Sequence, residues 1–294
     1  MRVAVTGANG FVGRAVVSAL VGAGRDVVAV TRSGAVPVVD TRSAALDRPD
    51  EIAAALADVD AVCHLAAIVR VRDSLADPLG TWRTNLGGTL AVLDALRPGA
   101  RIVLASTAAI SDDHRPQPHP YGAAKLAADL AARDAAVGGA LGAISLRLAN
   151  AAGPGDANRT RLLPAILAAA DGPGEFVVNG DGSAVRDLVH VADVADAFVA
   201  ALDAAEPGSY RAIPIGSGHP VSVGAILAAA GRVLGRPVPV RHREAAAEPA
   251  AVTVDPTRAH EILGLVPRRS GLDRIVRDAW EASEAPGGRP RVPL

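Results

Sequence analysis

The sequence predicts an α/β protein: a doubly wound parallel sheet with a smaller C-terminal α/β part. Three features indicate this class. Arg2–Thr6 is a short apolar run that ends in a glycine-rich turn and leads into an amphipathic helical pattern as far as about Gly24. Strand and helix patterns then alternate up to Leu148, as parallel sheets require. The alternation stops after Asn150-Ala-Ala-Gly-Pro-Gly155, where we expect the second part to begin.

The composition indicates a folded protein without an electrostatic preference for polyanions. Half of the 294 residues are hydrophobic and the net charge is −1, so neither nucleic acid nor a membrane is expected as a partner. The single cysteine, Cys63, excludes an intrachain disulfide. The N-terminal residues lack a signal-peptide pattern, and no uninterrupted apolar run reaches about 18 residues. We therefore expect a cytoplasmic protein.

The glycine-rich turn after the first strand is a candidate dinucleotide site. Its glycines let the backbone approach a pyrophosphate, and the following helix offers free N–H groups and a positive dipole end. The spacing is G-x-x-G-x-x-G and differs from the standard G-x-G-x-x-G of Rossmann domains. A plain tight βα turn is the alternative. The residues expected at the dinucleotide are Gly7, Asn9, Gly10, Phe11, Val12 and Gly13.

The second strand, Asp26–Thr31, bears on the identity of the coenzyme. An NAD-binding fold often places Asp or Glu at the end of this strand, on the ribose 2′-hydroxyl. Here Thr31 is followed by Arg32 and Ser33, which suit a 2′-phosphate. The sequence therefore leans weakly to NADP. The alternatives are that Arg32 is only solvated or stacks on the adenine.

The other elements follow in chain order. The run at 35–40 is a candidate third strand, and the hydroxyls of Ser106 and Thr107 end the fifth strand, at the edge where open α/β sheets bind ligands. We expect further strands at 60–65, 101–106, 142–148, 175–178 and 210–215, and helices at 48–57, 79–96, 121–137, 161–170, up to 204, 223–234, 257–263 and 272–282. A loop is expected at 111–120, and an untethered tail at 286–294.

Tyr121 and Lys125 stand out against the composition. Lys125 is the only lysine among 30 lysines and arginines, and Tyr121 is one of two tyrosines. Arginine replaces lysine as a solvated charge but not as a compact ammonium with a shiftable pKa. Residues four apart on a helix are neighbours, and an ammonium beside a phenol lowers the phenol's pKa from about 10. The pair suits general acid/base chemistry. A surface helix with an incidental lysine is the alternative.

Taken in order, these motifs resemble the extended short-chain dehydrogenase/reductase superfamily, and within it the NAD(P)-dependent sugar epimerase/dehydratase family. The resemblance covers nearly the whole chain. Its marks are Thr6-Gly7-x-x-Gly10-x-x-Gly13, His64-Leu-Ala-Ala67, Asn85 with Gly87-Gly88-Thr89, Ser106-Thr107-Ala108, Tyr121-x-x-x-Lys125, Leu146-Arg-Leu-Ala-Asn150 and Arg186-Asp-x-x-His190-Val-x-Asp193.

The resemblance implies a role for each matching position. Tyr121 is the implied acid/base, Lys125 binds the nicotinamide ribose and lowers the tyrosine pKa, and Thr107 hydrogen-bonds the reacting oxygen. His64 is given no catalytic role. The further implied dinucleotide contacts are Leu65, Ala66, Ala67 and Asn85, and the implied substrate contacts are Thr107, Asn150, Arg186 and Arg243.

The resemblance also implies a division of labour. Residues 1–151 would form the dinucleotide-binding Rossmann domain, with 186–217 returning to it. Residues 152–185 and 218–294 would bind the substrate. Arg186 matches an arginine that contacts substrate phosphate, for which its planar fork is apt. The alternative is an ion pair with Asp187 or Asp193.

Three positions depart from the family pattern. Family dehydratases tend to carry Asp-Glu after the catalytic threonine, whereas this chain has Ala108-Ala109, which argues against a sugar 4,6-dehydratase. The acidic residue near adenine has two candidates, Asp40 and Asp47. Arg243 stands in a weakly matching stretch.

The resulting hypothesis is an NAD(P)-dependent nucleotide-sugar epimerase that works through a keto intermediate. An NADPH-dependent keto-sugar reductase uses the same residues and is the first alternative; a non-catalytic dinucleotide-binding protein is the second. The resemblance further implies a homodimer formed through the helices at 79–96 and 121–137. No metal is implied.

Overall fold

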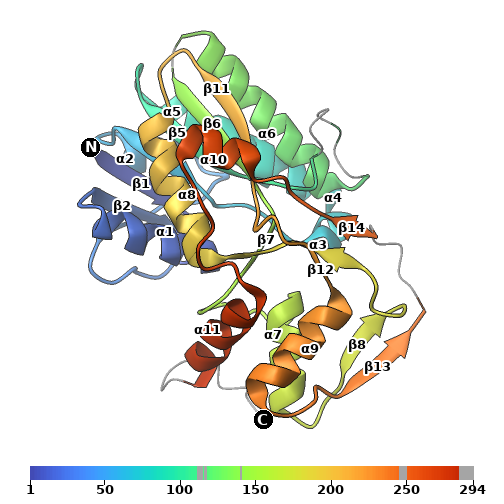
Figure 1. Cartoon of the computed structure of the whole chain (residues 1–294). Coiled ribbons are helices and arrows are strands. Elements are labelled where there is room, and N and C mark those ends of the chain that lie inside the picture. The colour runs from blue at the N-terminus through green and yellow to red at the C-terminus, as the bar shows by residue number, and fades with distance from the viewer. Residues whose placement is uncertain (111–114, 116–117, 140, 245–249, 285–294) are drawn as a thin grey trace. The chain divides into compact units, whose positions relative to one another are not determined.

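The computed structural model describes residues 1–110, 115, 118–139, 141–244 and 250–284 (Figure 1). The predicted loop at 111–120 lies partly outside this set, and the predicted tail at 286–294 lies wholly outside it. The chain forms two compact units. The first unit comprises Met1–Leu148, Val194–Ile215 and Thr257–Leu265, and the second comprises Ala149–Asp193, Gly216–Pro256 and Val266–Leu294. The assignment of coenzyme to one part and substrate to the other stays a prediction.

A seven-stranded parallel sheet organises the first unit and confirms the predicted doubly wound fold (Figure 1). The strand order is β11-β6-β5-β4-β1-β2-β3. The chain adds β2 and β3 on one side of β1 and the later strands, from β4 on, on the other side, so the switch point lies between β1 and β4. In open sheets, this switch point is where ligands bind. The strands are β1 (Arg2–Thr6), β2 (Asp26–Thr31), β3 (Asp40–Ser43), β4 (Ala61–His64), β5 (Arg101–Thr107), β6 (Gly142–Leu148) and β11 (Tyr210–Ile215).

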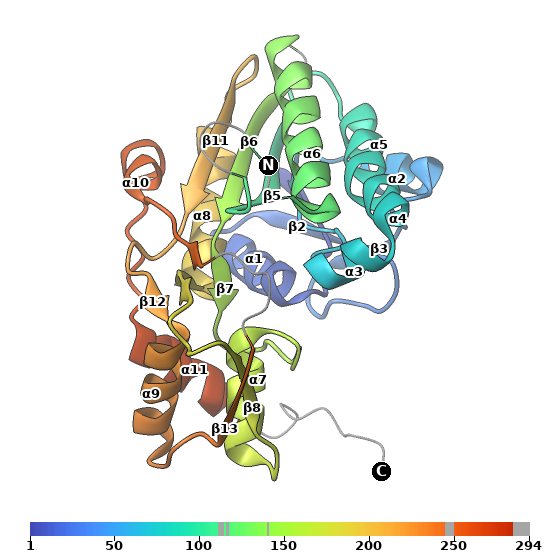
Figure 2. The same ribbon diagram turned by 90° about the vertical axis from the view of Figure 1, so that its right-hand side faces the viewer.

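Helices cover both faces of this sheet (Figure 2). One face carries α1 (Phe11–Gly22) and α8 (Val191–Ala204). An ion pair of 2.6 Å joins Arg25, just after α1, to Asp203 near the end of α8. The opposite face carries α2 (Pro49–Leu56), α5 (Gly88–Ala95) and α6 (Pro120–Val137). Because both faces are covered, the strands read as continuous apolar runs rather than alternating ones.

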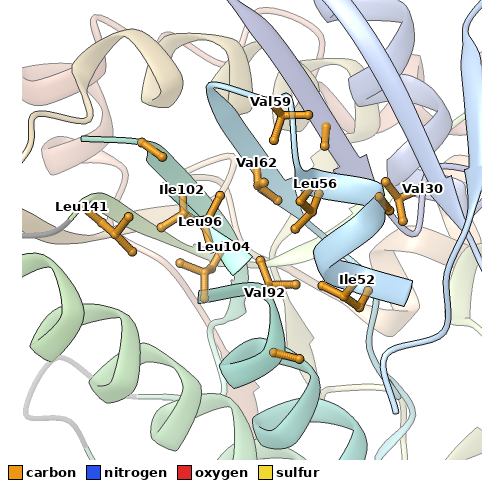
Figure 3. Close-up of a cluster of buried hydrophobic side chains, with 14 of the residues drawn as sticks. Val30, Ile52, Leu56, Val59, Val62, Val92, Leu96, Ile102, Leu104 and Leu141 are labelled. Atoms are coloured by element: carbon orange, nitrogen blue, oxygen red, sulfur yellow. The ribbon is translucent and has the colours of Figure 1, made fainter. Parts of the chain in front are cut away.

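A buried apolar cluster fills the space between the sheet and the α2–α5–α6 layer (Figure 3). The strands supply β-branched and leucine side chains, and the helices supply one apolar stripe each. The labelled members are Val30, Ile52, Leu56, Val59, Val62, Val92, Leu96, Ile102, Leu104 and Leu141. This packing holds the strand ends that carry the site.

The predicted third strand at 35–40 is wrong: β3 runs from Asp40 to Ser43. Pro37 begins a turn; it has no N–H for a ladder and fixes its own φ. Val38 then adopts a left-handed φ of 67° and is exposed. The apolar run therefore forms a turn, and the polar residues after it form the edge strand.

The predicted single helix at 79–96 is also wrong in detail. The chain forms α4 (Pro78–Trp82), the π-helical segment η1 (Arg83–Gly87) and α5 in succession. A short helix, α3 (Val71–Ala76), precedes them without having been predicted. The widened turn contains Asn85, whose side chain bonds a neighbouring loop, and π-bulges are often found at such functional positions.

Three helices and several short strands form the second unit. The helices α7 (Leu162–Asp171), α9 (Val223–Leu234) and α11 (Leu272–Glu284) pack around buried side chains that include Leu163, Ile226 and Ile275. Helix α10 (Thr257–Leu263) belongs to the first unit. The short strands are β7 (Asn150–Ala152), β8 (Phe176–Asn179), β9 (Val185–Arg186), β10 (Leu188–His190), β12 (Val221–Ser222), β13 (Val240–Arg243) and β14 (Ala251–Val252).

None of the helices in the described residues combines the length and hydropathy that a bilayer crossing requires. A cytoplasmic location stays a prediction.

The apolar cluster generates a stability prediction. Leu56→Ala should lower the free energy of unfolding by about 2–5 kcal/mol, because it removes a side chain that is 1% exposed and leaves a cavity. The matched control is Leu75→Ala, whose leucine is 59% exposed and should change stability by less than about 0.5 kcal/mol. Urea unfolding followed by circular dichroism measures both. Equal effects of the two substitutions would contradict the assigned core.

Candidate active site at the carboxyl edge of the sheet

The glycine turn after β1 is built from backbone in direct contact. Gly7 has a φ of 68°, which glycine alone adopts readily. A Cβ on Gly13 would lie 2.1 Å from the Gly7 carbonyl oxygen, and a Cβ on Gly7 would lie 2.9 Å from the Ala66 nitrogen. Gly10 is the N-cap of α1 and makes no side-chain cap bond. Anions bind favourably at such a helix start.

The segment after β4 lies against this turn. The Thr6 hydroxyl accepts hydrogen bonds from the backbone nitrogens of Leu65 and Ala66, at 3.1 and 3.2 Å. The Asn85 amide exchanges two bonds with the Ile68 backbone, at 2.8 and 2.9 Å. Asn85 was predicted to contact the dinucleotide; in the structure its amide holds the segment that includes Ala67. Its contribution to a coenzyme site would be to shape this wall.

The end of β2 closes the third side of the same region. The Asn9 side chain donates a 2.8 Å hydrogen bond to the Ser33 carbonyl oxygen, and Arg14 donates to the Asn9 carbonyl oxygen at 2.7 Å. Arg32 and Ser33 are both exposed. The structure therefore brings the predicted dinucleotide residues of three strand ends together around the switch point of the sheet.

These residues fit a dinucleotide. The turn has no room for side chains at Gly7 and Gly13, so its bare backbone could be approached closely by a pyrophosphate. Gly7, Gly10 and Gly13 would hold the pyrophosphate, and Leu65 and Ala66 would form the wall opposite. Within the described part of the chain, no group of three or more His, Cys, Asp or Glu side chains is arranged to hold a metal ion.

Tyr121 lies in the first turn of α6, and Lys125 follows one turn later. His119 caps the helix: its Nδ1 accepts a 3.0 Å hydrogen bond from the Gly122 nitrogen. The His119 and Tyr121 rings stack with centroids 6.0 Å apart. Burial lowers the pKa of His119, and the cap requires its unprotonated Nδ1. His119 was not among the predicted site residues, although a histidine before Pro-Tyr at a helix start could have indicated a cap.

Lys125 is buried, with only 6% of its surface exposed. Its ammonium donates a 2.8 Å hydrogen bond to the Ala105 carbonyl oxygen near the end of β5. Burial lowers the pKa of Lys125 to about 8, against an opposing effect of the Asp129 charge. A lysine with this pKa is still mainly cationic at pH 7, as the sequence argument from its uniqueness requires.

His64 is buried and hydrogen-bonded through both ring nitrogens, as a structural residue would be. Its ring nitrogens lie 2.8 Å from the Thr6 hydroxyl and 3.2 Å from the Thr89 hydroxyl. Burial, with a smaller contribution from the Lys125 charge, lowers the pKa of His64 to about 3. The ring is therefore neutral at physiological pH.

Thr107 is the last residue of β5 and is mostly buried. Its Oγ1 accepts a 3.1 Å hydrogen bond from the Ala109 nitrogen, which fixes the start of the following loop. The bond from Lys125 to Ala105 places the first turns of α6 at this same strand end. Thr107, Tyr121 and Lys125 thus belong to one edge of the first unit.

The predicted substrate residues other than Thr107 lie in the second unit. The Asn150 nitrogen donates to the Asp187 carbonyl oxygen at 3.0 Å, so Asn150 lies beside the Arg186-Asp187 pair. The buried Asp187 carboxylate accepts bonds from the nitrogen and hydroxyl of Ser217. Asp193 pairs with Arg269 at 3.1 Å. An ion pair of Arg186 with Asp187 or Asp193 stays the alternative to its predicted role.

Arg243 lies at the end of β13, in a different small sheet from Arg186. It is exposed and donates a 2.5 Å hydrogen bond to the Asn179 side chain. Its role in substrate binding stays a prediction.

Comparison with known proteins identifies a family and several similar structures. The family described as "NAD dependent epimerase/dehydratase family" matches residues 3–216. A UDP-glucose 4-epimerase of Corynebacterium glutamicum is 33% identical, over 98% of each chain. The crystal structure of a UDP-glucose 4-epimerase from Brucella ovis in complex with NAD is 30% identical, covers 95% of this chain and 97% of its own, and has a TM-score of 0.86.

A third similar structure is that of MoeE5 in complex with UDP-glucose and NAD. It is 29% identical, covers 96% of this chain and 98% of its own, and has a TM-score of 0.88. Two of these proteins are thus named UDP-glucose 4-epimerase, and the third is described in complex with UDP-glucose and NAD. The chain belongs to the NAD-dependent epimerase/dehydratase family, as the sequence motifs predicted. The lean to NADP finds no support here, since the similar structures contain NAD.

The glycine turn yields a prediction about coenzyme binding. Gly13→Ala should weaken dinucleotide binding about tenfold or more, because the new Cβ would collide with the Gly7 carbonyl and displace the turn. Gly22→Ala, on the same helix but with open space around it, is the matched control and should bind as the wild type does. Calorimetric titration with NAD and with NADP measures both variants, and circular dichroism checks folding. Undiminished binding by the Gly13 variant would contradict the assigned cradle.

Proposed function

We propose that the protein is a nucleotide-sugar epimerase that inverts one carbinol carbon of a UDP-hexose. The observation that carries the proposal is the buried Lys125 ammonium one helical turn after Tyr121, at the carboxyl edge of a dinucleotide-binding sheet. The relatives named UDP-glucose 4-epimerase support this choice of substrate class. Ala108 and Ala109, in place of the acidic pair of family dehydratases, argue against dehydration.

In the proposed chemistry, Tyr121 moves the proton. Lys125 holds a positive charge beside the phenol and favours its ionised form. The phenolate takes the proton of the sugar hydroxyl as its carbon loses hydride, and Thr107 orients the oxygen. Bound NAD(P) would accept the hydride and return it. The keto-sugar would then rotate within the site and present its opposite face to the coenzyme. The hydride would return to that face, and Tyr121 would give the proton back to the oxygen. The cycle therefore consumes no net hydride or proton.

Asn150 and Arg186 are proposed to hold the diphosphate of the substrate. A guanidinium binds phosphate oxygens through two parallel hydrogen bonds. The backbone bond from Asn150 to Asp187 keeps both side chains at neighbouring positions. Arg243 is the candidate for a further phosphate contact.

An NADPH-dependent keto-sugar reductase is the second candidate, and the exposed Arg32 and Ser33 at the end of β2 favour it. These side chains suit a 2′-phosphate. A reductase would release its coenzyme after every turnover, whereas an epimerase retains it. The coenzyme carried by the purified protein therefore separates the two candidates.

The proposal is tested with UDP-galactose and no added coenzyme. The protein should carry NAD(H) through purification and convert UDP-galactose to UDP-glucose, measured by anion-exchange chromatography. Tyr121→Phe should lower kcat by about 10²- to 10⁴-fold, because the proton carrier is lost. The amount of dinucleotide released on denaturation is the control and should match in both proteins. A protein purified without dinucleotide that oxidises NADPH with a keto-sugar would favour the reductase instead.

We further propose a homodimer formed through α4, α5 and α6. The family resemblance implies it, and Leu79 and Leu90 leave large apolar side chains exposed on this layer. The wild type should sediment at twice its chain mass of 29.6 kDa. Leu79→Glu combined with Leu90→Glu should give a monomer, and Val266→Glu, in the second unit, should not. A wild type that sediments as a monomer would refute the dimer.

A further inference from the structure

Asp129 is a buried acid for which the proposed chemistry has no use. It follows Tyr121 and Lys125 on the same face of α6, at successive intervals of four residues. Only 2% of its surface is exposed. A carboxylate is rarely buried unless it is paired, because it loses its hydration. The burial of this carboxylate in the first unit therefore requires compensating contacts.

The carboxylate is held by the two strands next to α6. The Ser106 hydroxyl of β5 donates a 3.0 Å hydrogen bond to its Oδ2. The buried Arg147 guanidinium of β6 lies 3.4 Å from the same oxygen. Burial raises the pKa of Asp129, and the hydrogen bond of Ser106 together with the charges of Arg147 and Lys125 opposes this effect.

Other groups around this acid do not neutralise it. Tyr210 of β11 faces the same cluster, and burial, with the Asp129 charge, raises the pKa of its phenol to about 12. Tyr210 is therefore un-ionised.

The remaining neighbours of the cluster leave two buried cations. His64 faces Lys125 from β4 and is neutral. Arg133 lies toward Tyr210 and is exposed. Lys125 and Arg147 are thus two buried cations with Asp129 as their shared counter-ion.

Lys125 and Asp129 are tied to consecutive residues of one strand. The ammonium binds the Ala105 carbonyl oxygen, and the carboxylate binds the Ser106 side chain. Burial alone drives Lys125 toward its neutral form, and Asp129 is the group that opposes this. Arginine remains charged at any pH a protein meets, whereas a lysine yields its proton. Without Asp129, burial would therefore act on Lys125 unopposed, and the lysine could respond by losing its proton.

We propose that Asp129, itself held by Ser106 and Arg147, is a positioning residue that keeps the Lys125 ammonium charged and in place. It acts on the reaction only through Lys125. Its effect on Tyr121 rests on the proposed function, but its effect on the charge of Lys125 does not. Loss of the carboxylate should leave a neutral amine beside Tyr121, which no longer favours the phenolate.

The test uses the fact that Lys125 is the only lysine in the chain. Full-length protein labelled with [ε-13C]lysine gives one lysine resonance, and its chemical shift followed against pH reports the Lys125 pKa without any assignment. In the wild type the midpoint should lie near 8. In Asp129→Asn it should fall by about one unit or more, which is the usual effect of losing a neighbouring opposite charge.

Two further variants make the result specific. Asp129→Glu keeps the charge and should restore a midpoint close to that of the wild type. Asp134→Asn removes an exposed acid from the same helix, paired only at the surface with Arg133, and should leave the midpoint unchanged. If UDP-galactose is turned over, the alkaline limb of the kcat profile should also move to lower pH in Asp129→Asn. A purely structural role would instead lower the rate equally at all pH values.

An unchanged Lys125 midpoint in folded Asp129→Asn would overturn the proposal. So would a wild-type Lys125 that is already neutral at pH 7, a measurement that stands even where the variant does not fold. Absence of epimerase turnover in a protein whose lysine titrates as expected would instead refute the proposed function and leave the role of Asp129 intact.

Discussion

The burial of a single ammonium, that of Lys125, is the interaction on which the rest of the site depends. An unpaired buried charge is too costly to persist, so the helix that carries Lys125 must lie where a carbonyl oxygen and an acid can compensate it. The Ala105 carbonyl oxygen meets the first need and Asp129 meets the second. Once α6 is fixed in this way, Tyr121 is placed one turn away, at the strand end that carries Thr107. The arrangement that can ionise a phenol is thus a consequence of how the helix is anchored.

A second constraint is the absence of side chains at Gly7 and Gly13, which determines the structure of the glycine turn after β1. The Gly7 carbonyl touches the position where Gly13 would carry a Cβ, and Gly7 itself abuts Ala66. The turn after β1 and the segment after β4 can approach this closely only as bare backbone. Thr6 and Asn85 then lock the β4 segment with their own hydrogen bonds. Close backbone contacts and the hydrogen bonds of Thr6 and Asn85 therefore shape the chain on both sides of the switch point.

Much of the fold could be predicted from the sequence because its signals are local. Buried parallel strands are apolar runs, and residues in the local sequence mark the glycine turn and most helix ends. The His119 cap of α6 is marked in the same way, although it was not predicted. The failures had two causes, a local turn residue inside an apolar run and a tertiary contact that changed a helix. Residues 35–39 are apolar enough for a strand, but Pro37 turns the chain and the polar Asp40–Ser43 takes the edge of the sheet. The widening of the helix at η1 accompanies the bond from Asn85 to Ile68, which no helical periodicity reveals.

Residues of the candidate site differ in how visible they are, and composition explains why. Lys125 could be singled out because every other position of its charge type is arginine, so its presence demanded a chemical reason. Asp129 lies four residues further along the same helix, yet aspartate is common in this chain and nothing local marks it. Only the three-dimensional contact with Ser106 and Arg147 distinguishes it from the solvated Asp134. A buried lysine nevertheless implies a counter-charge, and the helical spacing limits where that charge can be. Lys125 thus predicts that an acid lies nearby, and the structure identifies that acid as Asp129.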